Sequence, residues 1–196
     1  MNRLQALIAR RGRQSAKDRP QAMLLGLSEM PCSGWRVFSE GVWRTGSWGL
    51  PSSEEARVAY RAGLFGAIRW YEQVQPSRYM EIKIVEYVSK EHAESIMHDF
   101  KAQLTPIPRA QVTLVEERVI HDLEVSNPGN AWVYEQLTVG AERPSYSRFI
   151  AGNVDNVVIM VNGTGFRGLW PWEEVKAVAA AQGLKVERVL AEASGG

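Results

Sequence analysis

Cysteine is nearly absent from this chain of 196 residues, in which Cys32 is the only one. A single cysteine can form neither an intramolecular disulfide nor a zinc site with two or more thiolates. Long apolar runs are absent as well. The longest candidate, Asn156 to Val161, has the length of a strand and falls far short of the roughly 18 residues of a membrane-spanning helix. We therefore predict a protein without a membrane span that is stabilised by its core.

The N-terminus also lacks the apolar segment and the small-residue cleavage site of a signal peptide. A chain that is not exported and has one cysteine fits a reducing compartment, so we predict a cytoplasmic protein. Its length fits one domain, and 45% hydrophobic with 23% charged residues is typical of a globular one. A chain of this length buries roughly 70% of its unfolded surface and needs no metal to fold.

Net charge is small too, with a formal value of +1. This value hides an asymmetry, because residues 1–20 carry six basic residues against Asp18, a charge of +5, and the remainder carries −4. The pattern predicts a basic amphipathic arm, residues 1–22, followed by a single α+β domain, residues 23–196. The arm either docks on the domain or contacts a membrane surface, a nucleic acid or a protein, and the acidic domain makes nucleic acid unfavourable. Its candidate contact residues are Leu4, Leu7, Ile8, Arg10, Arg11 and Arg13.

Hydrophobic periodicity predicts the elements of the domain. A first strand lies near residues 35–38, and the capping-box spacing of Ser52 and Glu55 predicts a helix that runs to about Val74. The other predicted elements are a strand at 79–88, a helix at 90–104, strands at 111–120 and 131–139, a hairpin of 146–151 with 157–161, and a helix from about 171 to 182. Gly183 either ends this last helix or interrupts a continuation towards Leu190.

Several of these strands follow one another without an intervening helix. Such strands pair antiparallel, and helices at their flanks then cover the sheet. The order therefore predicts an α+β fold with an antiparallel sheet flanked by helices. The clearest strand alternates Met80, Ile82 and Ile84 with the charged Glu81 and Lys83.

The segment Gly163–Gly168 matches the G-x-G-x-x-G pattern of dinucleotide-binding loops and follows an apolar strand. In those loops the helix begins within the motif, so that its N-terminus holds the pyrophosphate. Here Trp170 and Pro171 stand where that helix would begin, and proline disrupts the interior of a helix. About thirty residues remain, too few for the rest of a doubly wound sheet. We interpret the segment as a glycine-rich loop and predict no cofactor.

No catalytic or metal site is legible in the sequence. His92 and His98 lie six residues apart in the predicted helix and so point in different directions. His121 beside Asp122 has no nucleophile or oxyanion donors near it in the pattern. Cys32 has no adjacent positive charge to lower its pKa. We therefore predict a protein that is not an enzyme.

Tryptophan is the most informative residue type, with seven copies. Trp35, Trp70 and Trp132 lie in periodic segments and are interpreted as core. The others lie in or beside glycine-rich loops, where they either cap the ends of the sheet or form a recognition surface. With their neighbours, the candidate binding residues are Trp43, Arg44, Trp48, Phe166, Arg167, Trp170 and Trp172.

Three segments carry a resemblance to a known fold. They are Leu24-Leu25 with Glu29-Met30-Pro31 and Gly34-Trp35, then the helix start Ser89–Ala93, and then the strand Asn156–Val161 before an alanine-rich closing helix. Over residues 23–190 the chain resembles small actinobacterial lipoproteins and kinase sensor domains with a PsbP-like fold. The resemblance implies an α/β/α sandwich around a curved antiparallel sheet, and non-enzymatic roles in ligand or partner binding. Such proteins are usually exported and often carry a lipid-attachment cysteine or disulfides, which this chain lacks, and residues 51–74 are interpreted as an insertion.

Two functional hypotheses follow. The first is a cytoplasmic binding or adaptor protein that engages another protein, or a second copy of itself, through the arm or the aromatic loops. The alternative is a small-molecule-binding protein or enzyme with a pocket near Trp43, Trp48 and Gly163–Gly168. A deep pocket lined by these aromatics would favour the alternative.

Overall fold

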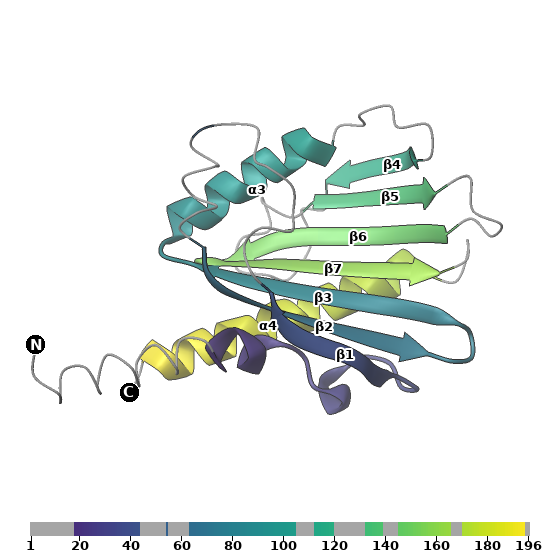
Figure 1. Ribbon diagram of the computed structural model, residues 1–196, viewed down its shortest axis with the longest axis horizontal. Coiled ribbons are helices and arrows are strands. Elements are labelled where there is room, and N and C mark those ends of the chain that lie inside the picture. Colours follow the sequence, from purple (N-terminus) through teal and green to yellow (C-terminus); the bar gives the residue numbers. More distant parts are fainter. Residues whose placement is uncertain are drawn as a thin grey trace, which may run out of the picture.

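The computed structural model describes residues 18–43, 54, 63–104, 112–119, 132–138, 145–165 and 170–194. These residues form a seven-stranded sheet in which every neighbouring pair is antiparallel, with helices packed against it (Figure 1). The α+β fold class predicted from the sequence is confirmed. The elements in chain order are η1 (Leu27–Glu29), β1 (Arg36–Trp43), β2 (Gly63–Gln73), β3 (Arg78–Tyr87), α3 (Lys90–Leu104), β4 (Val112–Val119), β5 (Trp132–Thr138), β6 (Ser145–Val154), β7 (Val157–Gly165) and α4 (Trp172–Ser194).

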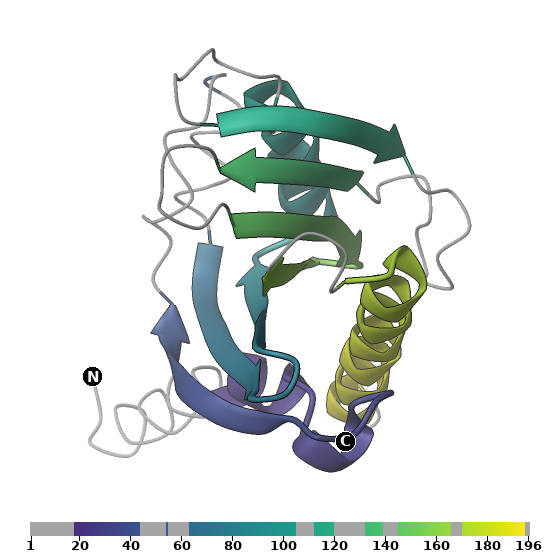
Figure 2. The ribbon, with the colours of Figure 1, turned by 90° about the vertical axis from the view of Figure 1, so that its right-hand side faces the viewer.

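The strand order is β1-β2-β3-β7-β6-β5-β4. The meander β1–β2–β3 and the meander β4–β7 meet where β3 pairs with β7, and α3 connects β3 to β4 at the opposite edge of the sheet (Figure 1). Figure 2 shows that the sheet is curved and that α4 lies along one side of it. None of the described helices is long and apolar enough to span a bilayer.

Strand β3 has two buried faces. Met80, Ile82 and Ile84 lie in the core that packs against α4, whereas Val85 and Tyr87 lie in a second core against α3. Because side chains alternate along a strand, this places α3 and α4 on opposite faces of the sheet. We call these the α3 face and the α4 face. The alternation predicted for residues 79–88 is confirmed at Met80, Ile82 and Ile84, whereas Val88 lies beyond the end of β3 and is 51% exposed.

One predicted helix is wrong. Residues 63–73, assigned to a helix that ended near Val74, form strand β2 between β1 and β3. Gly63 and Gly66 weaken a helix, while Ile68, Trp70 and Tyr71 are β-branched or aromatic and favour a strand. The segment is therefore part of the sheet, and its interpretation as an insertion stays a prediction.

Helix α3 agrees with its prediction, whereas the extent of α4 is decided by packing. Helix α3 spans Lys90–Leu104 as predicted, and Ser89 Oγ accepts a hydrogen bond from the backbone N–H of His92 at 3.3 Å. Helix α4 runs from Trp172 to Ser194 and passes through Gly183. Gly183 neither ends nor interrupts it, because this residue is buried and packing of the helix offsets the low helix propensity of glycine.

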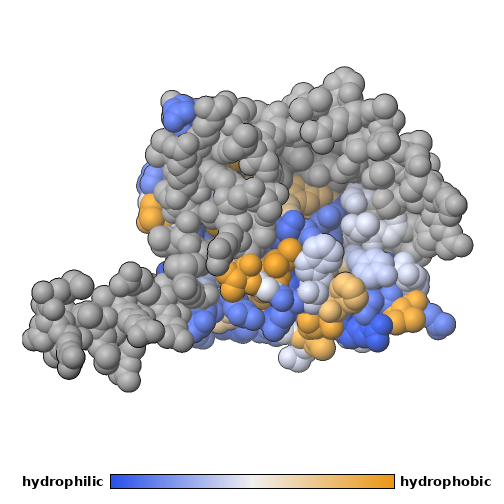
Figure 3. Space-filling model, in the orientation of Figure 1, coloured by the Kyte–Doolittle hydropathy of each residue, from blue (hydrophilic) through white to orange (hydrophobic). Residues whose placement is uncertain are grey.

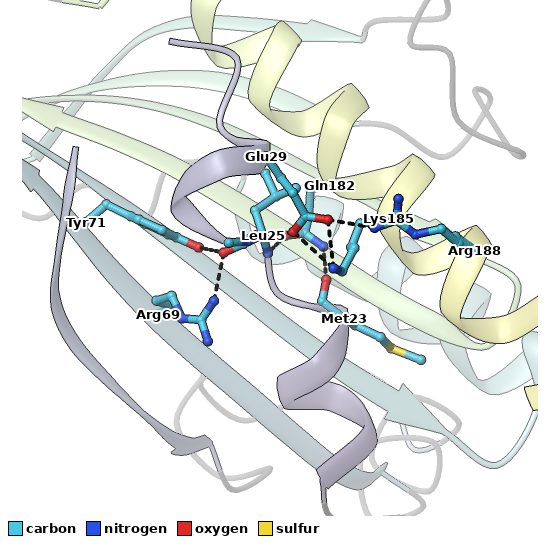
Figure 4. A network of polar contacts seen from close by, with 9 residues as sticks. Met23, Leu25, Glu29, Arg69, Tyr71, Gln182, Lys185 and Arg188 are labelled. Atoms are coloured by element: carbon cyan, nitrogen blue, oxygen red, sulfur yellow. Dashed lines mark hydrogen bonds and ion pairs between the residues drawn. The ribbon is translucent and has the colours of Figure 1, made fainter. Parts of the chain in front are cut away.

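A buried amide attaches the N-terminal segment to α4 (Figure 4). Gln182 is fully buried, and its Nε2 donates to the carbonyl oxygen of Met23 at 2.7 Å while its Oε1 accepts from the N–H of Leu25 at 3.1 Å. The carbonyl oxygen of Leu25 accepts in turn from Tyr71 Oη at 2.6 Å and from Arg69 at 2.7 Å. The extended backbone between helix 18–23 and η1 therefore satisfies its polar groups through α4 and β2.

Glu29 makes a second attachment beside this one. Its carboxylate accepts hydrogen bonds from Lys185 at 2.8 Å, from Arg188 at 2.6 Å and from the N–H of Gly26 at 2.7 Å (Figure 4). Burial by itself raises the pKa of this carboxyl group, but the hydrogen bonds and the charge of Lys185 outweigh it and lower the pKa to about 2. The ionised form of Glu29 therefore stabilises the fold.

Acid should weaken the fold through Glu29. Because its pKa is about 2 in the folded protein against an ordinary 4.5, its contribution is fully present above 4.5 and is lost as the pH falls through 2. We expect Glu29→Gln to cost roughly 1–2 kcal/mol at neutral pH, since solvent screens this partly exposed group. Urea unfolding of both proteins measures the difference, which should shrink in acid. The exposed Glu192→Gln on α4 is the control. If Glu29→Gln lowers the free energy of unfolding equally at neutral pH and in acid, the assignment is contradicted.

Candidate binding surface

Three aromatic side chains lie exposed on the α3 face of β1, β2 and β3. Phe38 is 59% exposed, Trp70 40% and Tyr79 43%, and the rings of Phe38 and Tyr79 meet edge to face with centroids 6.4 Å apart. The register pairs Trp70 with Glu81 and Glu72 with Tyr79, so these side chains share the face of Val85, which packs against α3. We call Phe38, Trp70 and Tyr79 the aromatic row.

Partial coverage by α3 leaves this row exposed. Ala93, Ile96 and Met97 of α3 pack on the end of the face formed by Val85, Met160 and neighbouring residues. The other end of the same face carries the aromatic row, and Tyr79 lies six residues before Val85 along β3. Figure 3 shows this side of the molecule, where apolar side chains gather over β1–β3 beside hydrophilic ones.

Polar residues continue the same face towards β6. Glu81 pairs in register with Asn162, and Tyr79 with Thr164, which in turn lies opposite Ser147. The hydroxyl oxygens of Ser147 and Thr164 are 3.2 Å apart and share a hydrogen bond. We call Glu81, Asn162, Thr164 and Ser147 the polar row.

Two ion pairs neutralise the charges of this surface. Arg36 contacts Glu72 at 2.7 Å, and Lys83 contacts Glu81 at 2.8 Å. One polar group remains unsatisfied, since Oδ1 of Asn162 is buried and has no hydrogen-bond partner. An unpaired buried acceptor costs about 1–3 kcal/mol, so this partly buried side chain would gain from a donor supplied by a ligand.

The α4 face holds a different cluster, centred on Arg78. The rings of Trp35 and Trp170 stack with centroids 5.5 Å apart, and the Arg78 guanidinium carbon lies 4.4 Å from the centroid of Trp170 and 5.3 Å from that of Trp35. Arg78 forms a two-pronged ion pair with Glu174 at 2.6 and 2.7 Å and also donates to Gln73 Oε1 at 2.6 Å. This bidentate geometry ties β2, β3 and α4 together.

Cys32 belongs to the same cluster. Its thiol donates to Glu174 Oε1 at 2.9 Å, and its sulfur accepts from Trp35 Nε1 at 3.1 Å. Burial raises the pKa of the Cys32 thiol, and the bond to Glu174 raises it further. Because the thiolate is the reactive species, Cys32 is held in its unreactive form.

Of the residues proposed from the sequence, Trp43, Trp170 and Trp172 lie in the described part of the chain. Trp170 and Trp172 are buried in the core of the α4 face, at 2% and 8% exposure, and Arg148 lies over the ring of Trp172 at 4.9 Å. Trp43 is the last residue of β1. The remaining predicted residues lie outside the described part of the chain, namely Arg44, Trp48, Phe166 and Arg167, and Leu4, Leu7, Ile8, Arg10, Arg11 and Arg13 of the predicted arm. In the described ranges, no three His, Cys, Asp or Glu side chains gather to hold a metal ion.

Sequence reasoning missed the aromatic row. The sequence interpretation places Trp70 in the core because it lies in a periodic segment, here assigned to a helix, and it assigns Phe38 and Tyr79 only to strands. A period-two reading of Gly66 to Gln73 would have placed Trp70 on the face opposite Tyr71, which is fully buried. The wrong period therefore concealed the exposed position of Trp70.

The described end of the arm is anchored to the sheet by charge. Arg19 lies in the helical residues 18–23, and its Nε donates to Glu86 Oε2 of β3 at 2.9 Å. The side chain of Glu86 is only 2% exposed, whereas that of Arg19 is 36% exposed. A buried carboxylate of this kind depends on its cationic partner.

Comparison with known proteins places the fold. No protein-family model matches the chain, and no curated protein matches it. Among solved structures, the extracellular domain of PknH from Mycobacterium tuberculosis is 15% identical, with a TM-score of 0.61, over 88% of this chain and 96% of that domain. An uncharacterized protein from Mycobacterium smegmatis, the Rv0999 ortholog, is 13% identical, with a TM-score of 0.46, over 84% and 95% of the two chains. The likeness to the PknH domain concerns the fold alone, and the PsbP-like label stays a prediction.

Removing Arg19 should expose the dependence of Glu86 on its partner. We expect Arg19→Ala to cost roughly 3 kcal/mol, because it leaves a buried carboxylate unpaired. Adding Glu86→Gln removes the charge, so the double variant should be more stable than Arg19→Ala alone. Urea unfolding checks the order, with Arg36→Ala, a 65% exposed partner of Glu72, as a control that costs under about 1 kcal/mol. If the double variant is less stable to urea than both single variants, the pairing of Arg19 with Glu86 is contradicted.

A side chain at position 163 should destabilise the fold, because the Trp170 ring occupies the space beside Gly163. A Cβ at Gly163 would lie 2.8 Å from Cδ2 of the buried Trp170, closer than carbon atoms approach, so Gly163→Ala should cost about 1–3 kcal/mol. Gly41→Ala in β1 is the matched control, since its Cβ would meet no atom within 4 Å. Urea midpoints compare the two variants, and similar midpoints would mean that the ring moves aside without cost.

Proposed function

We propose that this chain is a non-enzymatic binding domain whose ligand or partner lies on the uncovered part of the α3 face, over the aromatic row. The observation that carries the proposal is the exposure of Phe38, Trp70 and Tyr79 on adjacent strands of one rigid sheet. Contiguous exposed aromatic side chains mark interaction sites in soluble proteins, and aromatic anchors dominate binding energy where they occur.

The rigidity of the strands supports this role. β2 pairs with both β1 and β3, so the ladder fixes the spacing of the aromatic row before any ligand arrives. A surface that is ordered in advance loses little conformational entropy on binding. An exposed row on such a sheet is therefore suited to recognition.

The chemistry of the described residues also favours binding over catalysis. Arg78, Glu174 and Cys32 are engaged with one another and with Trp35, and the thiol has a raised pKa. Neither this cluster nor the aromatic row combines a nucleophile, a base and oxyanion donors, as a hydrolytic site would. The likeness to the extracellular domain of PknH is compatible with a general binding role.

The adaptor role of the basic arm and the aromatic-loop pocket are further proposals from the sequence. The residues that would carry them lie mainly in 1–17, 44–50 and 166–169, outside the described residues. The cytoplasmic location is likewise a proposal that rests on the sequence alone.

A fragment screen followed by protein NMR tests the proposed surface. We expect hits to shift resonances of Phe38, Trp70, Tyr79 and their strand neighbours, because small aromatic and polar fragments bind where larger ligands do. Trp70→Ser should abolish these shifts. Leu184→Ser, on the outer side of α4 and also exposed at 54%, is the matched control and should leave them unchanged.

The same spectra separate the rival sites. Shifts confined to residues of the arm would favour the adaptor role. Shifts confined to the loop residues around Trp48 or Phe166 would favour the pocket. Either result, with the aromatic row unaffected, would contradict the proposed surface.

A further inference from the structure

The aromatic row and the polar row lie next to each other and cross five adjacent strands, β1, β2, β3, β7 and β6. With neighbouring strands about 4.8 Å apart, the combined surface is about 20 Å long, perpendicular to the strands. One end presents the faces and edges of Phe38, Trp70 and Tyr79. The other end carries the half-buried side chains of Asn162, Thr164 and Ser147. An elongated ligand with both apolar and hydrogen-bonding parts matches this division.

Charge excludes the common polyionic ligands. Arg36 is paired with Glu72 and Lys83 with Glu81, so the surface presents no unpaired cation among these residues. Nucleic acids and other polyanions require several cationic groups for affinity. A cationic ligand would find the two carboxylates already paired. Charge complementarity therefore favours a neutral ligand.

Hydrogen-bonding capacity narrows the ligand further. Ser147, Thr164 and Asn162 each offer donors and acceptors, and Asn162 Oδ1 has no partner of its own. A polyproline segment would pack on the aromatic rings but has no backbone N–H to donate. A polyhydroxylated ligand supplies donors along its whole length, and hydroxyl groups can satisfy Asn162 once its amide turns towards the surface.

Aromatic side chains complement the same ligand. The C–H bonds on one side of a sugar ring form an apolar patch with partial positive charge, and the face of an aromatic ring carries the partial negative charge of its quadrupole. Trp70, the largest exposed ring, sits beside Glu81 in register, so a sugar ring on Trp70 would place hydroxyl groups near a carboxylate acceptor.

We propose that the ligand of this surface is a neutral carbohydrate, an oligosaccharide that stacks on the aromatic row and donates hydrogen bonds to the polar row. This inference rests on the proposed function, because it assigns a chemical class to the ligand of the same site. Trp70 and Tyr79 are stacking residues, and Asn162 and Glu81 accept hydroxyl protons.

The test uses the full chain on an array of neutral glycans, followed by calorimetric titration of those that bind. Maltohexaose, cellohexaose and chitohexaose serve as soluble probes in every experiment. We expect Trp70→Ala to weaken binding at least about tenfold, and Trp70→Phe to retain part of the affinity. Asn162→Ala should weaken it less. Leu184→Ala, an exposed apolar change on α4, should bind as the wild type does.

The outcomes distinguish this inference from the proposed function. Binding of a neutral glycan that Trp70→Ala removes and Leu184→Ala retains supports both. If no glycan binds on the array or in titration, while peptides or other fragments shift the aromatic row by NMR, the carbohydrate assignment is overturned and the binding surface remains. Glycan binding that is insensitive to Trp70→Ala overturns the assignment as well. If nothing binds over the aromatic row, both proposals fall.

Discussion

The rest of the structure depends on the pairing of β3 with β7 at the middle of the sheet, because both strands are covered on two faces. Met80, Ile82 and Ile84 pack towards α4, and Val85 and Tyr87 pack towards α3, along a single strand. Moving this strand by one residue in register would exchange the two faces and bury Glu81 and Lys83. The pairing therefore fixes where each helix packs and which side chains of β3 stay at the surface.

The proposed binding surface follows from the same constraint. Helix α3 covers only the end of its face near Val85 and Met160, so the other end keeps Phe38, Trp70 and Tyr79 exposed, although β2 and β3 are each paired on both sides. Exposed aromatic side chains reduce solubility and favour association. Three such side chains stay uncovered here, beside the ion pairs of Arg36 with Glu72 and of Lys83 with Glu81. Recognition of a ligand explains this exposure better than core packing does.

The α4 face shows the opposite use of similar residues. Trp35, Trp170 and Arg78 form a closed stack with Glu174 and Cys32, and Gly163 leaves the space that the Trp170 ring occupies. Together with Gln182, which binds the backbone of Met23 and Leu25, this cluster fastens the N-terminal segment to α4. The glycine at position 163 is therefore explained by the Trp170 ring, which packs closely on β7 at this point. The same residue types serve stability on one face and remain accessible on the other.

The sequence by itself determined the elements whose periodicity is unambiguous. The alternation at Met80, Ile82 and Ile84, the helix at 90–104 and the succession of later strands led directly to an antiparallel sheet with flanking helices, because burial of one face imposes a period on the chain. Tertiary structure alone decided the rest. Residues 63–73 became a strand because β1 and β3 pair with them on both sides, and α4 continued through Gly183 because that residue is buried. Whether Trp70 or Trp170 is exposed depended on how far each helix extends over the sheet, which is a property of long-range packing that no local pattern contains.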